Sequence, residues 1–232
     1  MRLKRLRAPK FWKIPKKGTK WTVSPRPGPH KKFEGIPLQL LTRDILKLVE
    51  TGKEAKTIIR KGKIFIDGKP RKDHAFSVGL MDIVAIPELK KFYRVLPTSK
   101  GLSLTEIPED ESNLKLCRIN NKKTISKGKT QLNLHDGKNI LVPKDVYKTG
   151  DSILLQLPEQ KIVDHVKLEK GNLILIFKGK NMGSIGELKE IIETRTREPN
   201  KVICEIEGNK TETIKDYVFV VGKNKPIITV SG

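Results

Sequence analysis

The chain has 232 residues, with 48 Lys and Arg against 26 Asp and Glu, so its formal net charge is +22. Its length is too great for one small module and suits two or three compact domains. This charge lies far outside the range that is usual for a soluble enzyme. It indicates a polyanionic partner, because each cation placed on a phosphate releases condensed counterions.

The sequence carries no signal for a membrane anchor, a metal site or a disulfide. It contains no long apolar run, signal-peptide pattern or lipidation motif, so we expect a soluble, cytoplasmic protein without a membrane partner. Cys117 and Cys204 lie far apart, with no CxxC pair and no His at ligand spacing, and we expect both to be buried as small apolar side chains. We therefore expect no metal, no cofactor and no small-molecule substrate.

The first 37 residues hold half of the excess charge. They contain 12 Lys and Arg, one acidic residue and six prolines. Prolines spaced this closely exclude a helix longer than two turns. We therefore predict a basic extended N-terminal arm over residues 1–37, which is mobile when free and ordered on its partner.

Aromatic side chains distinguish this arm from an ordinary disordered tail. Trp12 and Trp21, the two tryptophans of the chain, are interleaved with lysines, whereas disordered tails are poor in aromatics. RNA-binding proteins stack unpaired bases on aromatic faces and place cations on the backbone. Packing of either tryptophan against the next domain is an equal alternative. The candidate RNA-binding residues of the arm are Arg2, Lys4, Arg5, Arg7, Lys10, Trp12, Lys13, Lys16, Lys17, Lys20, Trp21, Arg26, Lys31 and Lys32.

Two helices are predicted after the arm. Apolar residues recur at helical spacing from Ile36 to Glu50 and predict an amphipathic helix ended by Gly52. A second short helix follows, with Ala55 and Ile59 on its apolar side and Gly62 as a left-handed cap. Its outer face is rich in Lys and Arg, so we expect a cationic surface there.

A hairpin and a further strand complete this module. Residues 63–66 alternate as in a short strand, and Asp67-Gly68 predicts a tight turn, since both residues tolerate positive φ. Another strand is predicted from Met81 to Ile86. The order helix, helix, strand, turn and strand predicts a small α/β domain over residues 38–98.

The stretch AKTIIRKGKIFIDGKPRKDHAFSVGLMDIVAI, residues 55–86, resembles the S4 RNA-binding domain of ribosomal proteins, pseudouridine synthases and some aminoacyl-tRNA synthetases. The matching features are Ala55, the run from Ile58 to Ile64, the Asp67-Gly68-Lys69 turn and Asp82-Ile83-Val84. In that family two helices and the following loop form one basic face against structured RNA. The resemblance implies that this face contains Arg43, Lys53, Lys56, Arg60, Lys61, Lys63, Lys69, Arg71 and Lys72.

The chain departs from the S4 pattern at two places. It has Ile66-Asp67-Gly68 where the family often has Val-Asn-Gly, and Leu80-Met81-Asp82 where the family has Gly-Asp before the last strand. These departures leave the fold intact. They weaken the assignment of any single RNA contact.

The second half of the chain consists of short apolar runs separated by turns. Between residues 99 and 165 such runs include 114–119, 131–134, 140–142 and 153–157, which predict a small β barrel or sandwich. This segment has 11 basic and 9 acidic residues. We therefore expect a central β domain that acts as a scaffold and not as a main RNA face.

Residues 166–232 form the last predicted unit. In KGKNMGSIGELKEIIE, Gly179, Gly183 and Gly186 lie on loops beside strands and resemble the KOW motif, a small SH3-like β-barrel of ribosomal proteins and transcription elongation factors. Ordinary turns are the alternative for three nearby glycines. We expect a C-terminal SH3-like (KOW) β-barrel, which makes the chain an α+β multidomain protein.

The order of these parts resembles the S4e family of small-subunit ribosomal proteins. The resemblance includes LKRLRAPKFWKIPKK, GTKWTVSPRPGPHKK and FEGIPLQLLTRDILKL, and covers the whole chain. It implies a structural constituent of the small ribosomal subunit that binds ribosomal RNA, supports translation and lies beside other small-subunit proteins. Archaeal and eukaryotic members share this layout, and the lack of a long lysine-rich extension past Gly232 favours the archaeal type.

Two alternatives remain: an RNA-modifying enzyme anchored by its S4-like domain, and a transcription factor of the KOW type. An enzyme needs an acid, base or nucleophile set in a pocket. The four histidines lie in different segments without a ligand pattern. Gly128-Lys129-Thr130 lacks the upstream glycine of a phosphate-binding loop, since Lys123 stands there. We predict that the protein is not an enzyme.

Overall fold

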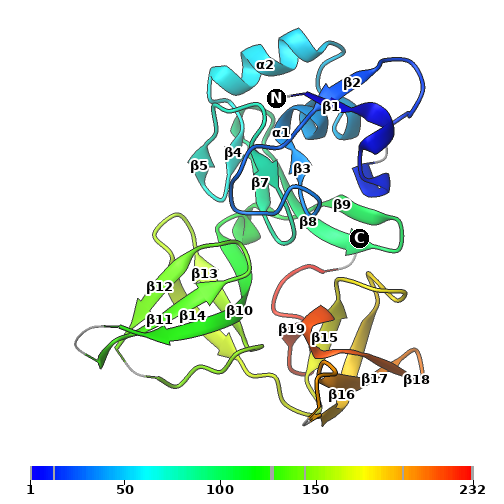
Figure 1. Ribbon diagram of the computed structural model, residues 1–232. Coiled ribbons are helices and arrows are strands. Elements are labelled where there is room, and N and C mark those ends of the chain that lie inside the picture. Colours follow the sequence, from blue (N-terminus) through cyan, green and yellow to red (C-terminus); the bar gives the residue numbers. More distant parts are fainter. Residues whose placement is uncertain (1, 13, 126–127, 144, 195, 231–232) are drawn as a thin grey trace. The chain divides into compact units, whose positions relative to one another are not determined.

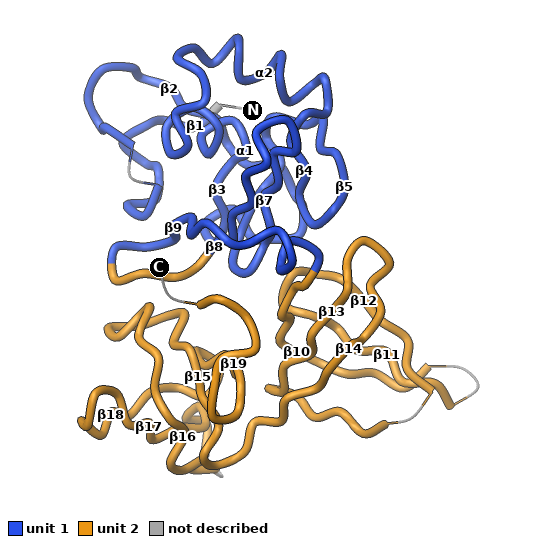
Figure 2. Tube along the Cα trace, turned by 180° about the vertical axis from the view of Figure 1, so that it is seen from behind, with its two compact units in different colours: residues 1–95, 100–113 blue, residues 96–99, 114–232 orange. Residues whose placement is uncertain are grey.

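The computed structural model describes residues 2–12, 14–125, 128–143, 145–194 and 196–230 (Figure 1). The chain divides into two compact units, which Figure 2 distinguishes by colour. Unit 1 comprises residues 1–95 and 100–113, and unit 2 comprises residues 96–99 and 114–232. Within the described ranges, every helix is too short or too polar to cross a membrane.

A five-stranded sheet in the order β5-β4-β7-β8-β9 forms the frame of unit 1 (Figure 1). Because β9 is bonded to β8, unit 1 extends to residue 113. The strands are β4 (Phe65–Ile66), β5 (Lys69–Pro70), β7 (Ile83–Ile86), β8 (Lys91–Thr98) and β9 (Gly101–Glu106), and short 3-10 turns lie at Pro87–Leu89 and Glu109–Glu111.

The first helix of unit 1 is shorter than predicted. α1 spans Leu38–Leu40 and continues as a π-helical turn over Leu41–Ile45. Soon afterwards Lys47 takes a φ of 52°, which lies outside the right-handed helical region. The helix predicted over residues 36–50 is therefore in the right place but too long at both ends.

The second helix, α2 (Gly52–Arg60), has the predicted position and the predicted end. At its start, Thr51 Oγ1 accepts a hydrogen bond from the Glu54 N–H over 3.2 Å, and the Glu54 carboxylate accepts one from the Thr51 N–H over 3.3 Å. This reciprocal pair is a capping box, which satisfies two N–H groups of the first turn. At the other end Gly62 takes a φ of 72°, as expected of a left-handed cap.

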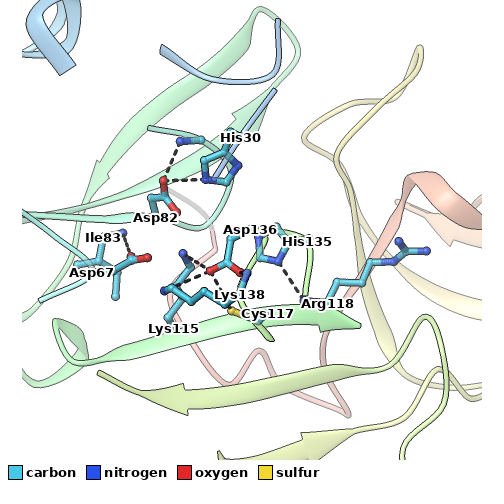
Figure 3. Close-up of polar contacts among 11 residues, drawn as sticks. His30, Asp67, Asp82, Ile83, Lys115, Cys117, Arg118, His135, Asp136 and Lys138 are labelled. Atoms are coloured by element: carbon cyan, nitrogen blue, oxygen red, sulfur yellow. Dashed lines mark hydrogen bonds and ion pairs between the residues drawn. The ribbon is translucent and has the colours of Figure 1, made fainter. Parts of the chain in front are cut away.

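The predicted hairpin turn lies between β4 and β5. Asp67 and Gly68 have φ angles of 53° and 72°, so both residues use the positive region that the sequence indicated. The Asp67 carboxylate also accepts a hydrogen bond from the Ile83 N–H over 3.2 Å (Figure 3). The turn is thereby fixed to the neighbouring strand β7.

The N-terminal arm is folded, which corrects the prediction of an extended segment. β1 (Arg2–Lys4) pairs with β2 (Trp21–Val23) in an antiparallel ladder. Two 3-10 turns lie between these strands, at Arg5–Arg7 and Lys10–Trp12. The prolines exclude long helices, as expected, but they do not prevent a compact hairpin.

The physical cause of this folding is the apolar content of the arm. Trp12 is 0% exposed, and its indole N–H donates to the Gly35 carbonyl over 3.0 Å. Ala8 and Ile14 are buried in the same core as residues of α1. Burial of a tryptophan removes a large apolar area from water, and its N–H has a partner here, so packing outweighs the entropy of a free arm.

A buried polar contact fixes the end of the arm. His30 Nε2 lies 2.8 Å from Asp82 Oδ2, which also accepts the Gly79 N–H over 2.9 Å (Figure 3). A Cβ on Gly79 would overlap the His30 imidazole, so this position requires glycine. Nearby, the short strands β3 (Ile36–Pro37) and β6 (Ser77–Val78) pair with each other.

Unit 2 contains two five-stranded antiparallel sheets (Figure 1). The first has the order β12-β11-β10-β13-β14 and buries Cys117, as predicted. Its strands are β10 (Leu114–Thr124), β11 (Thr130–Leu134), β12 (Asn139–Val142), β13 (Ser152–Gln156) and β14 (Lys161–Val166).

The second sheet of unit 2 has the order β18-β17-β16-β15-β19 and buries Cys204, also as predicted. A 3-10 turn, η7 (Lys215–Tyr217), precedes its last strand. The strands are β15 (Leu173–Ile176), β16 (Ile185–Ile192), β17 (Lys201–Ile206), β18 (Asn209–Ile214) and β19 (Val218–Gly222).

The burial of Trp12 predicts a large difference between the two tryptophans. Trp12→Ala should lower the free energy of unfolding by about 3–5 kcal/mol, as for other buried aromatic truncations. Trp21 is 43% exposed, so Trp21→Ala should cost roughly 1 kcal/mol or less. Urea unfolding of both variants measures this. Limited proteolysis should cut residues 1–37 faster in Trp12→Ala alone, and equal cutting in both variants and wild type would contradict a docked arm.

Candidate nucleic-acid interface

α2 presents cations on the side opposite to its core-facing residues. Ala55 and Ile59 are each 0% exposed, whereas Lys53, Arg60 and Lys61 at and beside the helix are exposed. In the part of the chain that the structure describes, no acidic side chain pairs with these three cations. Arg60 and Lys61 also lie at the C-terminal end, where the helix dipole favours positive charge.

The segment after the β4–β5 hairpin lies beside the end of α2. Lys72 Cε is 3.7 Å from the point that a Cβ on Gly62 would occupy. The Arg71 guanidinium lies 4.4 Å from the centre of the Phe76 ring, a cation–π distance that fixes this side chain. Lys69 is exposed on β5. Two groups of cations that are separate in the sequence therefore adjoin here.

The pKa of His74 is sensitive to the positive charges on this surface. Burial lowers its pKa below the ordinary 6.5, and the charge of Lys56 lowers it further, as do those of Arg26 and Arg60. Asp73 acts in the opposite direction and does not compensate. The arm and α2 thus place positive charge around one imidazole, which makes this surface favourable for an anion.

Arg26 connects the arm to the segment around His74. Its backbone N–H donates to the Ala75 carbonyl over 2.9 Å, and its guanidinium lies 3.3 Å from the Asp73 carboxylate. The Arg26 side chain is 58% exposed, so this ion pair leaves most of the guanidinium available to solvent. We use the name basic cluster for the five cations that meet here: Arg26, Lys56, Arg60, Lys61 and Lys72.

Two exposed aromatic rings of the arm have a lysine beside them. Lys20 Nζ lies 5.6 Å from the Trp21 ring centre, and Lys32 Nζ lies 5.5 Å from that of Phe33. Phe33 is 61% exposed, more than Trp21. An exposed ring beside a cation suits one unpaired nucleotide, since the base can stack and the phosphate can pair. We had not predicted Phe33 as a contact residue, although it directly follows Lys31 and Lys32.

The remaining predicted cations of the arm divide into exposed and engaged side chains. Arg5 is 8% exposed and donates to the Pro15 carbonyl and the Thr19 hydroxyl, so it supports the arm from within. Lys16 Nζ donates to the Ala8 carbonyl over 2.6 Å. The exposed side chains are Lys4, Arg7, Lys10, Lys17 and Lys31.

Three other predicted residues do not present a free cation or ring. Arg43 is bound to Asp44 at 2.8 Å, and Lys63 to Glu88 at 2.9 Å. Trp12 lies in the core, as the alternative reading allowed, so we withdraw it as a stacking residue. Lys13 and the side chain of Arg2 lie outside the described part of the structure.

Unit 2 contains a buried polar group that the sequence did not reveal. Ligand atoms of Cys117, His135 and Asp136 lie within 4.8 Å of one another, because β10 passes beside the β11–β12 turn (Figure 3). However, Asp136 Oδ2 is 2.9 Å from Lys115 Nζ and 3.2 Å from Lys138 Nζ. Two ammonium groups so close repel a metal ion, so we interpret the group as an ion-pair network.

This network controls the ionisation of Asp136. Burial raises the pKa of its carboxyl group, but Lys115, followed by His135 and Lys138, outweighs burial and holds the pKa well below its usual range. Both Asp136 and Lys115 have 0% side-chain exposure. A charge this deeply buried is stable because it is paired.

Three family models match consecutive parts of the chain. The RS4NT domain matches residues 1–33, the S4 domain residues 44–84, and Ribosomal family S4e residues 89–162. The basic cluster draws on the first two of these segments, with Arg26 in the first and the other four cations in the second.

Several full-length relatives are similar to this chain. The Small ribosomal subunit protein eS4 of Archaeoglobus fulgidus is 52% identical over 228 residues, covering 97% of this chain and 96% of the relative. The protein of the same name from Methanothermobacter thermautotrophicus is 46% identical over 232 residues, covering 99% and 96%. The crystal structure of the 30S ribosomal protein S4e from Thermoplasma acidophilum has a TM-score of 0.71 and 28% identity, covering 82% of this chain and 96% of that one.

The field around His74 predicts how its pKa responds to charge removal. Lys56→Gln should raise the pKa of His74 towards 6.5, because one of the charges that destabilise the imidazolium is lost. Lys53→Gln removes the same charge from the same helix but does not act on His74, so it is the matched control. An NMR pH titration of the imidazole protons measures both. An equal response in the two variants would contradict the basic cluster.

The lowered pKa of Asp136 predicts an acid-sensitive stability. Its pKa is lower in the folded chain than in the unfolded one, so its contribution is fully present above about pH 4 and is lost as pH falls. Asp136→Asn should cost about 3–5 kcal/mol at neutral pH, since the buried Lys115 ammonium then loses the Asp136 carboxylate, and should flatten the acid dependence. Asp145→Asn, at the exposed pair with Lys122, should cost at most about 1 kcal/mol. Thermal unfolding between pH 2 and 7 compares them, and similar pH profiles for both variants would exclude this network.

Proposed function

The chain belongs to the ribosomal protein family S4e, and we propose on this premise that it is a structural component of the small ribosomal subunit that binds ribosomal RNA. The relatives named above carry the small-subunit designation and match almost the whole chain. Membership of this family also means that the protein is a structural component and not an enzyme. Its place of action is the ribosome in the cytoplasm, beside other small-subunit proteins.

The observation that carries the RNA-binding part of the proposal is the basic cluster. Five cations from the arm, α2 with its C-terminal end and the segment after β5 meet on one surface of unit 1, and three of them, Lys56, Arg26 and Arg60, add to burial in lowering the pKa of His74. Like charges held together repel one another, and a polyanion relieves this repulsion. Each phosphate bound there also releases counterions, so affinity should fall steeply with salt.

The mode of recognition is shape and phosphate contact. The basic cluster lies on the folded arm, on α2 with its C-terminal end, and on the segment after β5, so the backbone holds its cations near one another, which suits the phosphates of folded RNA. Trp21 and Phe33 then offer stacking surfaces for unpaired bases on the arm. Base-edge contacts have a smaller part in this proposal. The exposed lysines of the arm extend the phosphate-binding surface.

We also propose the four-part division of the chain: the arm 1–37, the S4-like domain 38–98, a central β domain 99–165 and a KOW-like SH3-type barrel 166–232. The sheet of the last part supports the barrel, because β15 to β18 follow one another and β19 returns beside β15, an order that curls into a small barrel. Gly183 supports the KOW reading: it has a φ of 93°, and a Cβ there would lie 2.8 Å from Thr98 Cα.

Replacement of the basic cluster tests this function. The triple variant Arg60→Gln, Lys61→Gln and Lys72→Gln should weaken binding to naked small-subunit ribosomal RNA. It should also reduce the slope of log affinity against log salt by about two to three units, roughly one per lost phosphate contact. We leave Lys63 unchanged, because Glu88 already neutralises it. Filter binding at several salt concentrations gives both quantities.

The matched control removes three cations that are already paired with acids in unit 2: Lys122→Gln, Lys189→Gln and Lys201→Gln. Its net charge changes by the same amount. If the control lost as much affinity and slope as the cluster variant, binding would depend on total charge alone, and the proposed surface would be wrong.

A further inference from the structure

A polar cavity of about 250 Å³ lies in unit 2. It is lined by β10, the segment before β13, the segment before β17 and the turn η7. Its volume is below that of usual sites for drug-sized ligands, so it suits a small group. The cavity-lining side chains that matter here are Arg118, Asn120, Thr149, Asn200, Lys215 and Asp216.

Arg118 is buried in this cavity wall without full neutralisation. Its side chain is 9% exposed, and Figure 3 shows it extending away from the Lys115–Asp136 network. One terminal nitrogen donates to Asn120 Oδ1 over 2.9 Å and the other to Asp216 Oδ1 over 3.2 Å. Its Nε is buried and has no acceptor among the described residues. A buried donor without an acceptor is costly, so an anion that supplies an acceptor would stabilise this guanidinium.

The acid beside Arg118 is a weak counter-ion. Asp216 is 78% exposed and makes a single contact with the guanidinium. An exposed carboxylate of this kind is strongly hydrated, and such pairs contribute little. It does not compensate a guanidinium that has lost its own water. Asp216 can therefore turn into solvent at small cost when a better anion arrives.

The other lining groups add hydrogen-bond donors. Lys215 lies on η7 next to Asp216, and no acidic side chain of the described residues pairs with it. Asn200 Oδ1 is engaged by Thr194, which leaves its amide N–H₂ as the group without a described partner. Asn120 Oδ1 is similarly engaged by Arg118. A guanidinium, an ammonium, two amide donors and the Thr149 hydroxyl thus meet around one small space.

We infer that this cavity binds a phosphate group of the RNA backbone through Arg118 and Lys215. A planar guanidinium with an adjacent ammonium is a donor set that matches phosphate oxygens. Backbone phosphate suits this place better than a base, because the small volume admits one phosphate and the donors carry no base-edge pattern. The inference rests on the proposed RNA-binding function, and it gives unit 2 an RNA contact of its own.

Salt-dependent binding of naked small-subunit ribosomal RNA tests the site with the full-length chain. Lys215→Gln should lower the salt slope by about one unit and the affinity several-fold. Asp216→Asn should raise the affinity several-fold, because the competing carboxylate is removed. The controls are Lys201→Gln and Glu212→Gln, which remove the same charges from an exposed pair on neighbouring strands. Unchanged thermal unfolding of Lys215→Gln establishes that it is folded.

The outcomes separate this site from the rest of the interface. Effects of Lys215→Gln and Asp216→Asn that exceed those of the controls support it. Effects equal to those of the controls overturn it. The RNA-binding function itself is tested separately, by the RNA affinity of the wild-type chain and of the basic-cluster variant. Inorganic phosphate provides a second probe, read on the Arg118 Nε–H signal by NMR. A shift of that signal by phosphate, with RNA binding of the variants equal to the controls, would assign the cavity to free phosphate and overturn the RNA contact.

Discussion

The packing of the N-terminal arm on the core of unit 1 is the contact on which the basic surface depends. Trp12 in the core and His30 on Asp82 fix the arm at two points on either side of Arg26, so Arg26 lies beside α2. Without these contacts the 12 basic residues of this segment would spread apart by repulsion. The free energy of apolar burial therefore holds the cations close together against their mutual repulsion. The resulting local positive charge then favours the binding of RNA.

In unit 2, burial also determines how charged side chains are arranged, but it acts on individual buried groups and does not gather exposed cations on a surface. There, burial is used to pair charges completely, as at Lys115 and Asp136, or to leave one cation short of an acceptor, as at Arg118. The first arrangement stabilises the sheet, and the second creates a place for an anion. The central segment 99–165, with 11 basic and 9 acidic residues, is thus more than a scaffold in this account, because the local position of the Arg118 guanidinium matters more than the net charge of the segment.

Local signals in the sequence predicted much of unit 1. Periodic apolar residues and Gly62 gave α2, and Asp67-Gly68 gave the hairpin, because each depends on residues close together in the chain. The burial of Trp12 could not be decided in this way, since its partner Gly35 becomes its neighbour only when the arm folds back. The role of Arg118 was likewise hidden, because Asp216 lies almost a hundred positions away. Sequence showed which residues carry charge, and tertiary contacts decided which of them remain free.

The most direct test of a structural role in the small subunit is sedimentation of a native lysate of the source cells through a sucrose gradient at moderate magnesium. The gradient is then repeated after a high-salt wash, and the protein is followed across the fractions. A ribosomal constituent makes many phosphate and protein contacts at once, so it should remain with the small subunit through the wash. Recovery mainly in light fractions before the wash would contradict the assignment and would point to an RNA-binding protein that acts outside the ribosome.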